Sequence, residues 1–151
     1  DEVYKDSCVE CFLQPREGGG YFNFEFNCGG ALRVFYITDP VRAPGGFRAF
    51  APLSPEAGAR VRVAATLPAV VEPEIAAPTA WELVFGIPLA VLEATSGPLG
   101  PRPGRRWRAN FYKCADDTSH PHWAAWSPLD RLDFHRPACF GVLQFAGPRG
   151  G

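Results

Sequence analysis

The chain has 151 residues, of which 46% are hydrophobic and 21% are charged, and this is the size and balance of one globular domain. Fifteen basic residues stand against sixteen acidic ones, which argues against a nucleic-acid surface and against a polybasic membrane patch. No apolar run approaches the roughly 18 residues that a membrane-spanning helix needs. The many aromatic residues, with 16 glycines and 16 prolines, predict short strands joined by turns, and hence one all-β domain over residues 1–151.

The first strands are predicted near the N-terminal end. Residues 8–13 (CVECFL) predict a strand that ends at Pro15 and a run of glycines. Residues 21–27 (YFNFEFN) predict the clearest strand of the chain, because apolar and polar side chains alternate with a period of two. The three phenylalanines then face a core, and the other four side chains face solvent. A glycine turn leads into a further strand over 32–37, so the two strands predict a hairpin.

The middle of the chain predicts less regular structure. Residues 38–59 are rich in Pro, Gly and Ala and predict a long irregular excursion. Strands are predicted over 60–66 and 81–85, with a proline-rich loop between them. Pro88 opens a predicted short helix within residues 87–93, because proline is favoured in the first turn of a helix.

The last third predicts a long strand, a long loop and a closing strand. Residues 107–114 (WRANFYKC) predict the long strand, with Ala109 and Phe111 facing inward beside Trp107. The loop over 115–138 holds three histidines and two tryptophans, and 140–145 predict the final strand. From this alternation the predicted core contains Phe22, Phe24, Phe26, Leu32, Val34, Val84, Phe111, Val142 and Leu143.

Compact enzyme signatures are missing from the sequence. It has no Gly-rich phosphate loop, no G-x-S-x-G elbow and no H-E-x-x-H motif. Asp116–Asp117 and the pair Glu10 and Glu25 are the candidates for catalytic carboxylates. Paired carboxylates on a solvent-facing strand are more often hydrogen-bonded or solvated than catalytic. We therefore expect a non-enzyme and predict no catalytic residue.

The cysteine pattern predicts neither disulfides nor metal. Five cysteines are present, and an odd number fits a disulfide framework poorly. Cys8 and Cys11 form a C-x-x-C, but in a strand residues three apart point to opposite faces. We expect Cys8 to be buried, and we expect the two not to share a metal or bond to each other. No metal site and no cofactor are predicted.

Polar side chains on the strands suggest a sugar site. A sugar needs planar hydrogen-bonding groups for its hydroxyls and an aromatic ring for its apolar C–H face. The candidates from the strands and the long loop are Glu10, Asn23, Glu25, Arg108, Asn110, Tyr112, Trp123 and Trp126. We expect them on a face shared by strands 21–27 and 107–113, roofed by the loop over 115–138. The alternative interpretation is that they are surface polar residues and core tryptophans.

Asn110 is a specific test of this placement. Because it and Trp107 are an odd number of residues apart, they cannot both point outward from a regular strand. We expect Asn110 to face solvent. Its replacement by alanine is then expected to weaken sugar binding about tenfold, with little loss of stability, and Trp126→Ala is expected to weaken binding similarly.

Three stretches together resemble the family 9 carbohydrate-binding modules, most closely the family-9-like group of separate bacterial proteins. Residues 3–12 are similar to a V-Y-x-D-S-C-V-E-x-F segment, and residues 21–30 to a Y-x-N-F-E-F-N-x-x-G strand. Residues 107–141 are similar to W-x-x-N-F-Y followed by W-S-P and F-H-x-P-x-x-F-G. The resemblance implies a jelly-roll-like or immunoglobulin-like β-sandwich that binds sugar without hydrolysing it. In characterised modules of this family a pair of tryptophans clamps a terminal sugar of a plant polysaccharide.

The resemblance also sets expectations about what surrounds the domain. Family members usually have one or two strands before the V-Y-x-D-S-C segment, and this chain begins there. We expect an N-terminally truncated domain whose missing strand is supplied by another segment, or a domain attached to a catalytic one. The predicted role is carbohydrate binding, to a plant-type polysaccharide or an oligosaccharide end, in support of carbohydrate catabolism.

Two alternatives to sugar binding remain open at this stage. One is a haem- or redox-binding relative on a similar sandwich, which could use only histidine ligands because the chain has no methionine. The other is a structural or partner-binding domain with no sugar site. A visible absorption spectrum tests the first of these, and binding to glycans tests the second.

Overall fold

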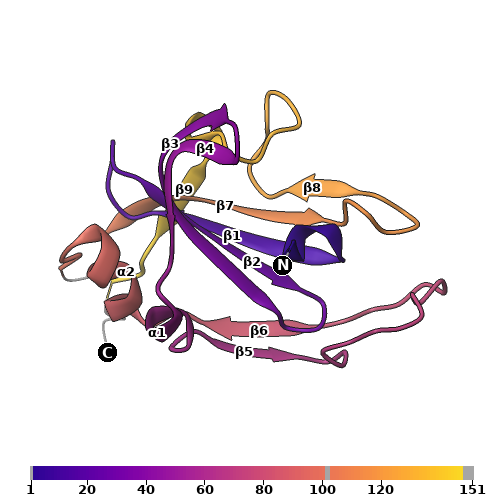
Figure 1. Cartoon of the computed structure of the whole chain (residues 1–151). Coiled ribbons are helices and arrows are strands. Elements are labelled where there is room, and N and C mark those ends of the chain that lie inside the picture. Colours follow the sequence, from indigo (N-terminus) through magenta and orange to yellow (C-terminus); the bar gives the residue numbers. More distant parts are fainter. Residues whose placement is uncertain (1, 101–102, 148–151) are drawn as a thin grey trace.

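The computed structural model describes residues 2–100 and 103–147, and it confirms the prediction of an all-β sandwich (Figure 1). In chain order the elements are η1 (Val3–Lys5), β1 (Cys8–Gln14), β2 (Tyr21–Asn27), β3 (Leu32–Ala43), β4 (Gly46–Pro52), α1 (Pro55–Gly58), β5 (Arg62–Ala65), β6 (Leu83–Gly86), α2 (Leu89–Ser96), β7 (Arg106–Cys114), β8 (Trp123–Ala125), η2 (Pro137–Cys139) and β9 (Gly141–Gln144). No helix in these described ranges is long and apolar enough to cross a membrane.

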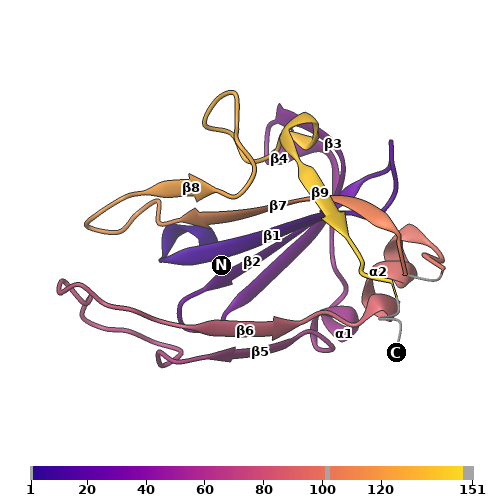
Figure 2. The same cartoon turned by 180° about the vertical axis from the view of Figure 1, so that it is seen from behind.

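The strands form one large antiparallel sheet and one small one. The large sheet has seven strands in the order β4-β3-β2-β1-β7-β8, and β9 pairs with the first half of β7. The two strands β5 and β6 form the small sheet, which lies below the large one (Figures 1 and 2). Because β1 is central, Glu10 has Glu25 of β2 opposite it on one side and Tyr112 of β7 on the other.

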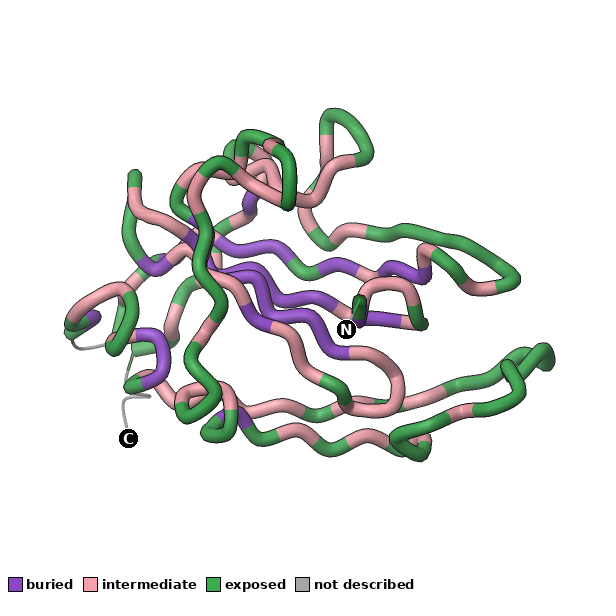
Figure 3. The backbone as a smooth tube through the Cα atoms, in the orientation of Figure 1, coloured by how far each residue is buried: buried purple, intermediate pink, exposed green. Residues whose placement is uncertain are grey.

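The main core lies between the two sheets. Phe22, Phe24 and Phe26 are fully buried there, and Phe26 stacks on Phe85 of β6 with ring centroids 4.5 Å apart. Side chains of α2 and of β7 complete this core. Figure 3 shows the buried stretches running along the central strands. Burial of each phenylalanine side chain stabilises the fold by about 1.5–3 kcal/mol. This free energy would be lost if the strand turned its other face to the core, so the alternating pattern predicts the buried face correctly here.

Three of the predicted core residues are exposed instead. Phe22, Phe24, Phe26 and Val34 are buried, and Leu32 and Leu143 pack against them. Val84 is 71% exposed and Val142 is 45% exposed. Their strand neighbours Leu83, Phe85 and Leu143 pack against the core, so the side chains of Val84 and Val142 point to the opposite, outer face. Phe111 is 36% exposed, because it borders an open groove that Phe85 and Trp126 also line. Its ring packs edge-on against Trp126.

The excursion predicted for residues 38–59 is wrong for most of its length. Strand β3 continues to Ala43 and pairs with β4 in a long hairpin. The register shifts between Ile37 and Asp39 and again before Arg42, which are irregularities of the β-bulge type. Proline is tolerated at bulges and on edge strands, so the proline-rich composition here does not exclude a strand.

The opposite face of the large sheet is also covered. The segment between β8 and β9, residues 126–140, folds over it and buries a second aromatic cluster that includes Phe12, Tyr21 and Tyr112. Tyr112 stacks on Phe134 of this segment, with ring centroids 4.1 Å apart. The prediction that Tyr21 and Tyr112 face solvent is therefore wrong: the loop brings apolar side chains of its own.

Candidate functional site

A cleft of about 560 Å³ lies over the polar part of β1 and β2. Its floor is formed by β1 and β2, one wall by the β3–β4 hairpin and the other by residues 132–135. Tyr4 of η1, Asp116 and Trp123 border the end nearest β8. Clefts of about 300–1,000 Å³ with a few convergent polar groups are typical of small-ligand sites.

The floor of the cleft presents buried hydrogen-bond acceptors. The Nδ2 of Asn23 donates to Oε1 of Glu25 at 2.8 Å, and both side chains are almost completely buried. The Asn23 Oδ1 and the Glu25 Oε2 have no hydrogen-bond partner among the described residues. The nearest cation is Arg33, whose Nη1 lies 4.0 Å from Glu25 Oε2. A buried acceptor without a hydrogen bond lowers the free energy of unfolding by about 1–3 kcal/mol, so a donor that enters the cleft and binds these two oxygens would be stabilised.

Glu10 completes the floor and differs from Glu25 in its partners. It is 6% exposed, and burial, followed by the nearby Glu25, raises its pKa well above the ordinary value. The Sγ of Cys114 lies 3.3 Å from Glu10 Oε1. The pKa of Glu25 is also raised, mainly by burial, while the Asn23 amide and Arg33 oppose the shift. Two carboxyl groups therefore face one another across β1 and β2 in a poorly solvated site.

Aromatic rings line the hairpin wall. Phe47 and Phe50 pack edge-on at 5.7 Å between centroids, and Phe50 packs on Phe35 at 5.3 Å. The guanidinium of Arg42 lies over the Phe47 ring at 4.5 Å, and that of Arg33 over the Phe35 ring at 4.7 Å. Arginines stacked in this way hold both the rings and their own charges in place.

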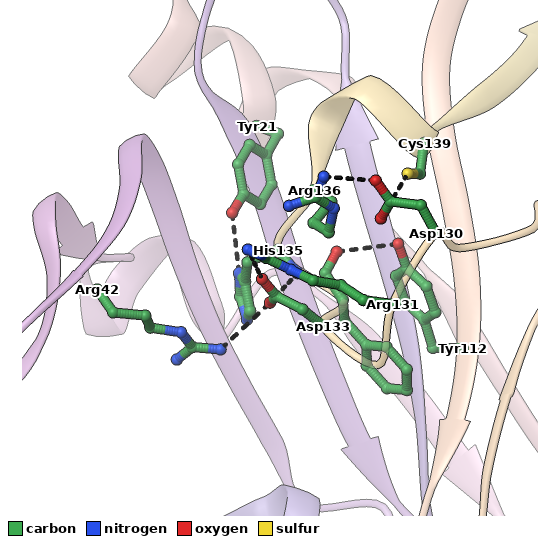
Figure 4. A network of polar contacts seen from close by, with 10 residues as sticks. Tyr21, Arg42, Tyr112, Asp130, Arg131, Asp133, His135, Arg136 and Cys139 are labelled. Atoms are coloured by element: carbon green, nitrogen blue, oxygen red, sulfur yellow. Dashed lines mark hydrogen bonds and ion pairs between the residues drawn. The ribbon is translucent and has the colours of Figure 1, made fainter.

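A polar network fastens the second wall to the sheet and to the hairpin (Figure 4). Asp133 pairs with Arg42 of the hairpin at 3.6 Å and accepts from the backbone N–H of His135 at 3.2 Å. Nδ1 of His135 pairs with the hydroxyl of Tyr21 at 2.8 Å. Burial, followed by the charge of Arg42, lowers the pKa of His135 to about 3. The imidazole is therefore neutral at physiological pH, and the wall is joined to the sheet by the His135–Tyr21 hydrogen bond and to the hairpin by the Arg42–Asp133 ion pair.

The structure brings four of the eight predicted site residues to the cleft. Glu10, Asn23 and Glu25 form the floor, and Trp123 stands at the rim. Trp123 is 46% exposed, and its Nε1 donates to Asp116 Oδ1 at 2.7 Å, which fixes the ring. Trp126 lies outside the cleft, where it is 55% exposed and packs against Phe111.

The other three predicted residues hold the covering segment in place. Asn110 is completely buried: its Nδ2 donates to the carbonyl of Ser127 at 3.1 Å, and its Oδ1 accepts from the Ser127 N–H at 2.8 Å. The expectation that Asn110 faces solvent is therefore wrong. The Tyr112 hydroxyl donates to the carbonyl of Phe134 at 3.0 Å, and Arg108 donates to the carbonyls of residues 137, 138 and 140.

Sequence reasoning missed the residues of the hairpin wall. Arg42, Phe47 and Phe50 fall in the segment that was predicted to be irregular. A usable signal existed in the run Gly46-Phe-Arg-Ala-Phe-Ala51, where two phenylalanines, which favour strands, follow directly after a glycine pair that can form the turn of a hairpin. The long separation between this run and β1 hides its place in the site.

The predictions for the cysteines hold where the structure tests them. Cys8 is fully buried, as expected. Cys11 packs in the main core while Cys8 packs with Val3 and Cys114 on the other face, so the predicted opposite projection is confirmed. Cys8, Glu10 and Cys114 place a ligand atom each within 4.8 Å of one another, a grouping that the sequence did not predict.

Comparison with known proteins finds one matching family and one similar solved structure. Residues 1–145 match the model of carbohydrate-binding family 9. Among solved structures, the chain is similar to a "putative carbohydrate-binding protein" from Bacteroides uniformis ATCC 8492, with a TM-score of 0.79 and 33% sequence identity. The match covers 93% of this chain and 62% of that one, so the chain spans less than two thirds of that protein's length. Among curated proteins, none matches the chain.

Proposed function

Because the chain belongs to carbohydrate-binding family 9, we propose that it binds the end of a plant-type polysaccharide or of an oligosaccharide in the cleft over β1 and β2. The family and the similar B. uniformis protein support carbohydrate binding in general. The proposal adds the place of the site, the kind of ligand, the absence of hydrolysis and a role in carbohydrate catabolism.

The observation that carries the proposal is the pair of unpaired acceptors on the floor. Asn23 Oδ1 and Glu25 Oε2 are buried and have no donor among the described residues. Neighbouring sugar hydroxyls are donors that can satisfy both oxygens, whereas an apolar ligand would leave them unpaired at a cost of about 1–3 kcal/mol each. Arg33 completes the set as a fixed donor, and its position over the Phe35 ring leaves little rotamer entropy to lose.

Aromatic rings at the cleft supply the second requirement for a sugar. Phe47 and Phe50 line one wall and Trp123 stands at the rim, so C–H faces of the sugar rings can stack on carbon while hydroxyls reach the floor. The Arg42–Asp133 ion pair joins the two walls at one side. This closure favours the end of a chain over a chain that continues through the cleft.

Binding assays on oligosaccharides with three variants test the proposal. The expected dissociation constant for the parent is roughly micromolar to millimolar, as for a few polar contacts and stacked rings. Trp123→Ala and Glu25→Gln should each weaken binding about tenfold or more in calorimetry, which corresponds to about 1.4 kcal/mol. The matched control is Trp126→Ala, an exposed tryptophan outside the cleft, and it should bind like the parent. Loss of binding in Trp126→Ala, with Trp123→Ala unchanged, would move the site to the other tryptophan.

Two further assays separate the alternatives. Incubation with aryl glycosides should release no aglycone, because Glu10 and Glu25 on the cleft floor are both buried and Glu25 is hydrogen-bonded to Asn23. A haem would need converging axial ligands, but of the three histidines only His135 borders the cleft and its Nδ1 is paired with Tyr21. A visible spectrum with a haem band in purified protein would contradict this assignment.

A further inference from the structure

Two thiols and one carboxyl group converge at the deep end of the cleft, where β1 meets β7. Cys8 and Glu10 are two residues apart on β1 and so point to the same face. Cys114 is the cross-strand partner of Cys8, which brings its side chain to that face as well. One ligand atom from each residue lies within 4.8 Å of the other two, and Cys114 Sγ lies 3.3 Å from Glu10 Oε1.

The charges around this cluster favour a cation. Glu10 lies opposite Glu25 in the register of β1 and β2, and both are about 6% exposed. Glu10 forms no ion pair within the described part of the chain, and the Arg33 guanidinium reaches only Glu25, at 4.0 Å. Glu25 Oε2 is buried and without a hydrogen-bond partner among the described residues. Buried carboxyl groups need a counter-charge or must stay protonated, and a divalent ion would supply that charge.

The donor set and its surroundings select the metal. Thiolate sulfur favours zinc over calcium and magnesium, which prefer oxygen ligands. Val3 lies in the same buried hydrophobic cluster as both thiols, and Phe134 packs against that cluster, so one side of the site is apolar. Glu10 and Cys114 border the cleft, so a fourth position would open toward it. Three protein ligands and one open position are the pattern of accessible zinc sites.

We propose that Cys8, Glu10 and Cys114 bind one zinc ion, with the fourth coordination position open to the cleft. The two thiols and the carboxyl group lose their protons when the ion binds. This inference does not rest on sugar binding, since the cluster is defined by β1 and β7 alone. It departs from the expectation drawn from the C-x-x-C motif, because the second thiol comes from Cys114 and not from Cys11.

Metal titration of the full chain tests the proposal. The protein is treated with a chelator, kept reduced with a phosphine, and titrated with zinc against a chromophoric competitor. We expect one zinc per chain and no comparable binding of calcium. Cobalt in place of zinc should give a thiolate-to-cobalt charge-transfer band and the visible bands of a tetrahedral ion.

Variants assign the ligands. Cys8→Ser, Cys114→Ser and Glu10→Gln should each weaken zinc binding by about 100-fold or more, since even outer-shell changes cost 10–100-fold. Cys139→Ser is the matched control, because this cysteine lies outside the cluster, and it should bind zinc like the parent. Circular dichroism of each variant establishes that it is folded before titration.

Three results would overturn the proposal. The first is a reduced, folded parent that takes up no zinc. The second is full zinc binding in Cys114→Ser, which would place the ion elsewhere, for example at His120 and His122. The third is a cobalt spectrum without the thiolate band.

Discussion

Replacing Asn110 with alanine should separate the stability of this domain from its sugar binding. Asn110 is completely buried and makes two hydrogen bonds to the backbone of Ser127, and its Oδ1 also accepts from the N–H of Phe111 at 3.0 Å. These bonds fasten the start of the segment that covers the second face of the sheet. None of the groups involved borders the cleft.

The expected loss can be worked from these contacts. Three hydrogen bonds at about 0.5–1.5 kcal/mol each give about 1.5–4.5 kcal/mol lost from the free energy of unfolding. For a domain of this size that lowers the melting temperature by roughly 5–15 °C. Urea unfolding at equilibrium measures the first quantity, and a thermal scan the second. Sugar affinity, measured well below the transition, should stay within about twofold of the parent.

Asn23→Ala is the matched variant and should behave in the opposite way. Asn23 is also a buried asparagine of the large sheet, but it makes a single hydrogen bond, to Glu25, and its Oδ1 is unpaired. Its replacement should cost about 1 kcal/mol of stability and weaken sugar binding about tenfold. The reasoning is refuted if Asn110→Ala loses sugar affinity while fully folded and keeps its stability.

Two further predictions concern the pH dependence of stability and a glycine with no room for a side chain. The folded-state pKa values of Glu10 and Glu25 are raised, so these two groups bind more protons in the folded protein than in the unfolded chain, and their contribution to the free energy of unfolding should fall as pH rises above about 4.5. His135, whose pKa is lowered, acts in the opposite direction below about pH 6.5, so the fall should be measured by urea unfolding as the difference between the parent and a Glu10→Gln, Glu25→Gln double variant; equal pH dependence in the two would contradict it. Gly20→Ala should lower the free energy of unfolding by about 1–3 kcal/mol, because a Cβ there would lie 2.7 Å from both the carbonyl oxygen of Ile37 and Cζ of Tyr36; a change below about 0.5 kcal/mol in urea unfolding would contradict this.

The sequence by itself determined most of the strands and the phenylalanine part of the main core. Alternation with a period of two places Phe22, Phe24 and Phe26 on one face, and the structure buries all three against the small sheet. The opposite projection of Cys8 and Cys11 follows from the same geometry. These features depend on neighbours in the chain, because the direction of a side chain on a strand is set by its own backbone.

Only the tertiary structure decided which residues are covered on the face of the large sheet that points away from the small sheet. The sequence pattern correctly places Asn23, Glu25, Asn110 and Tyr112 together on one face, but it cannot show which part of that face is covered. Residues 126–140 pack over Asn110 and Tyr112 and leave the region above Asn23 and Glu25 as a cleft. Polar residues under the 126–140 segment form hydrogen bonds that hold this segment on the sheet, whereas polar residues that line the cleft remain available to a ligand.

The two walls and the thiol cluster depend on contacts between distant segments. Arg42 and Asp133 form an ion pair although they are 91 residues apart in the sequence (133 minus 42). Cys8 lies beside Cys114 only because β1 pairs with β7 in one particular register. A shift of that register by one residue would send every side chain of one strand to the other face. Local patterns decide which residues form strands, whereas pairing between strands decides which side chains meet. In this protein that pairing forms the cleft and the thiol cluster.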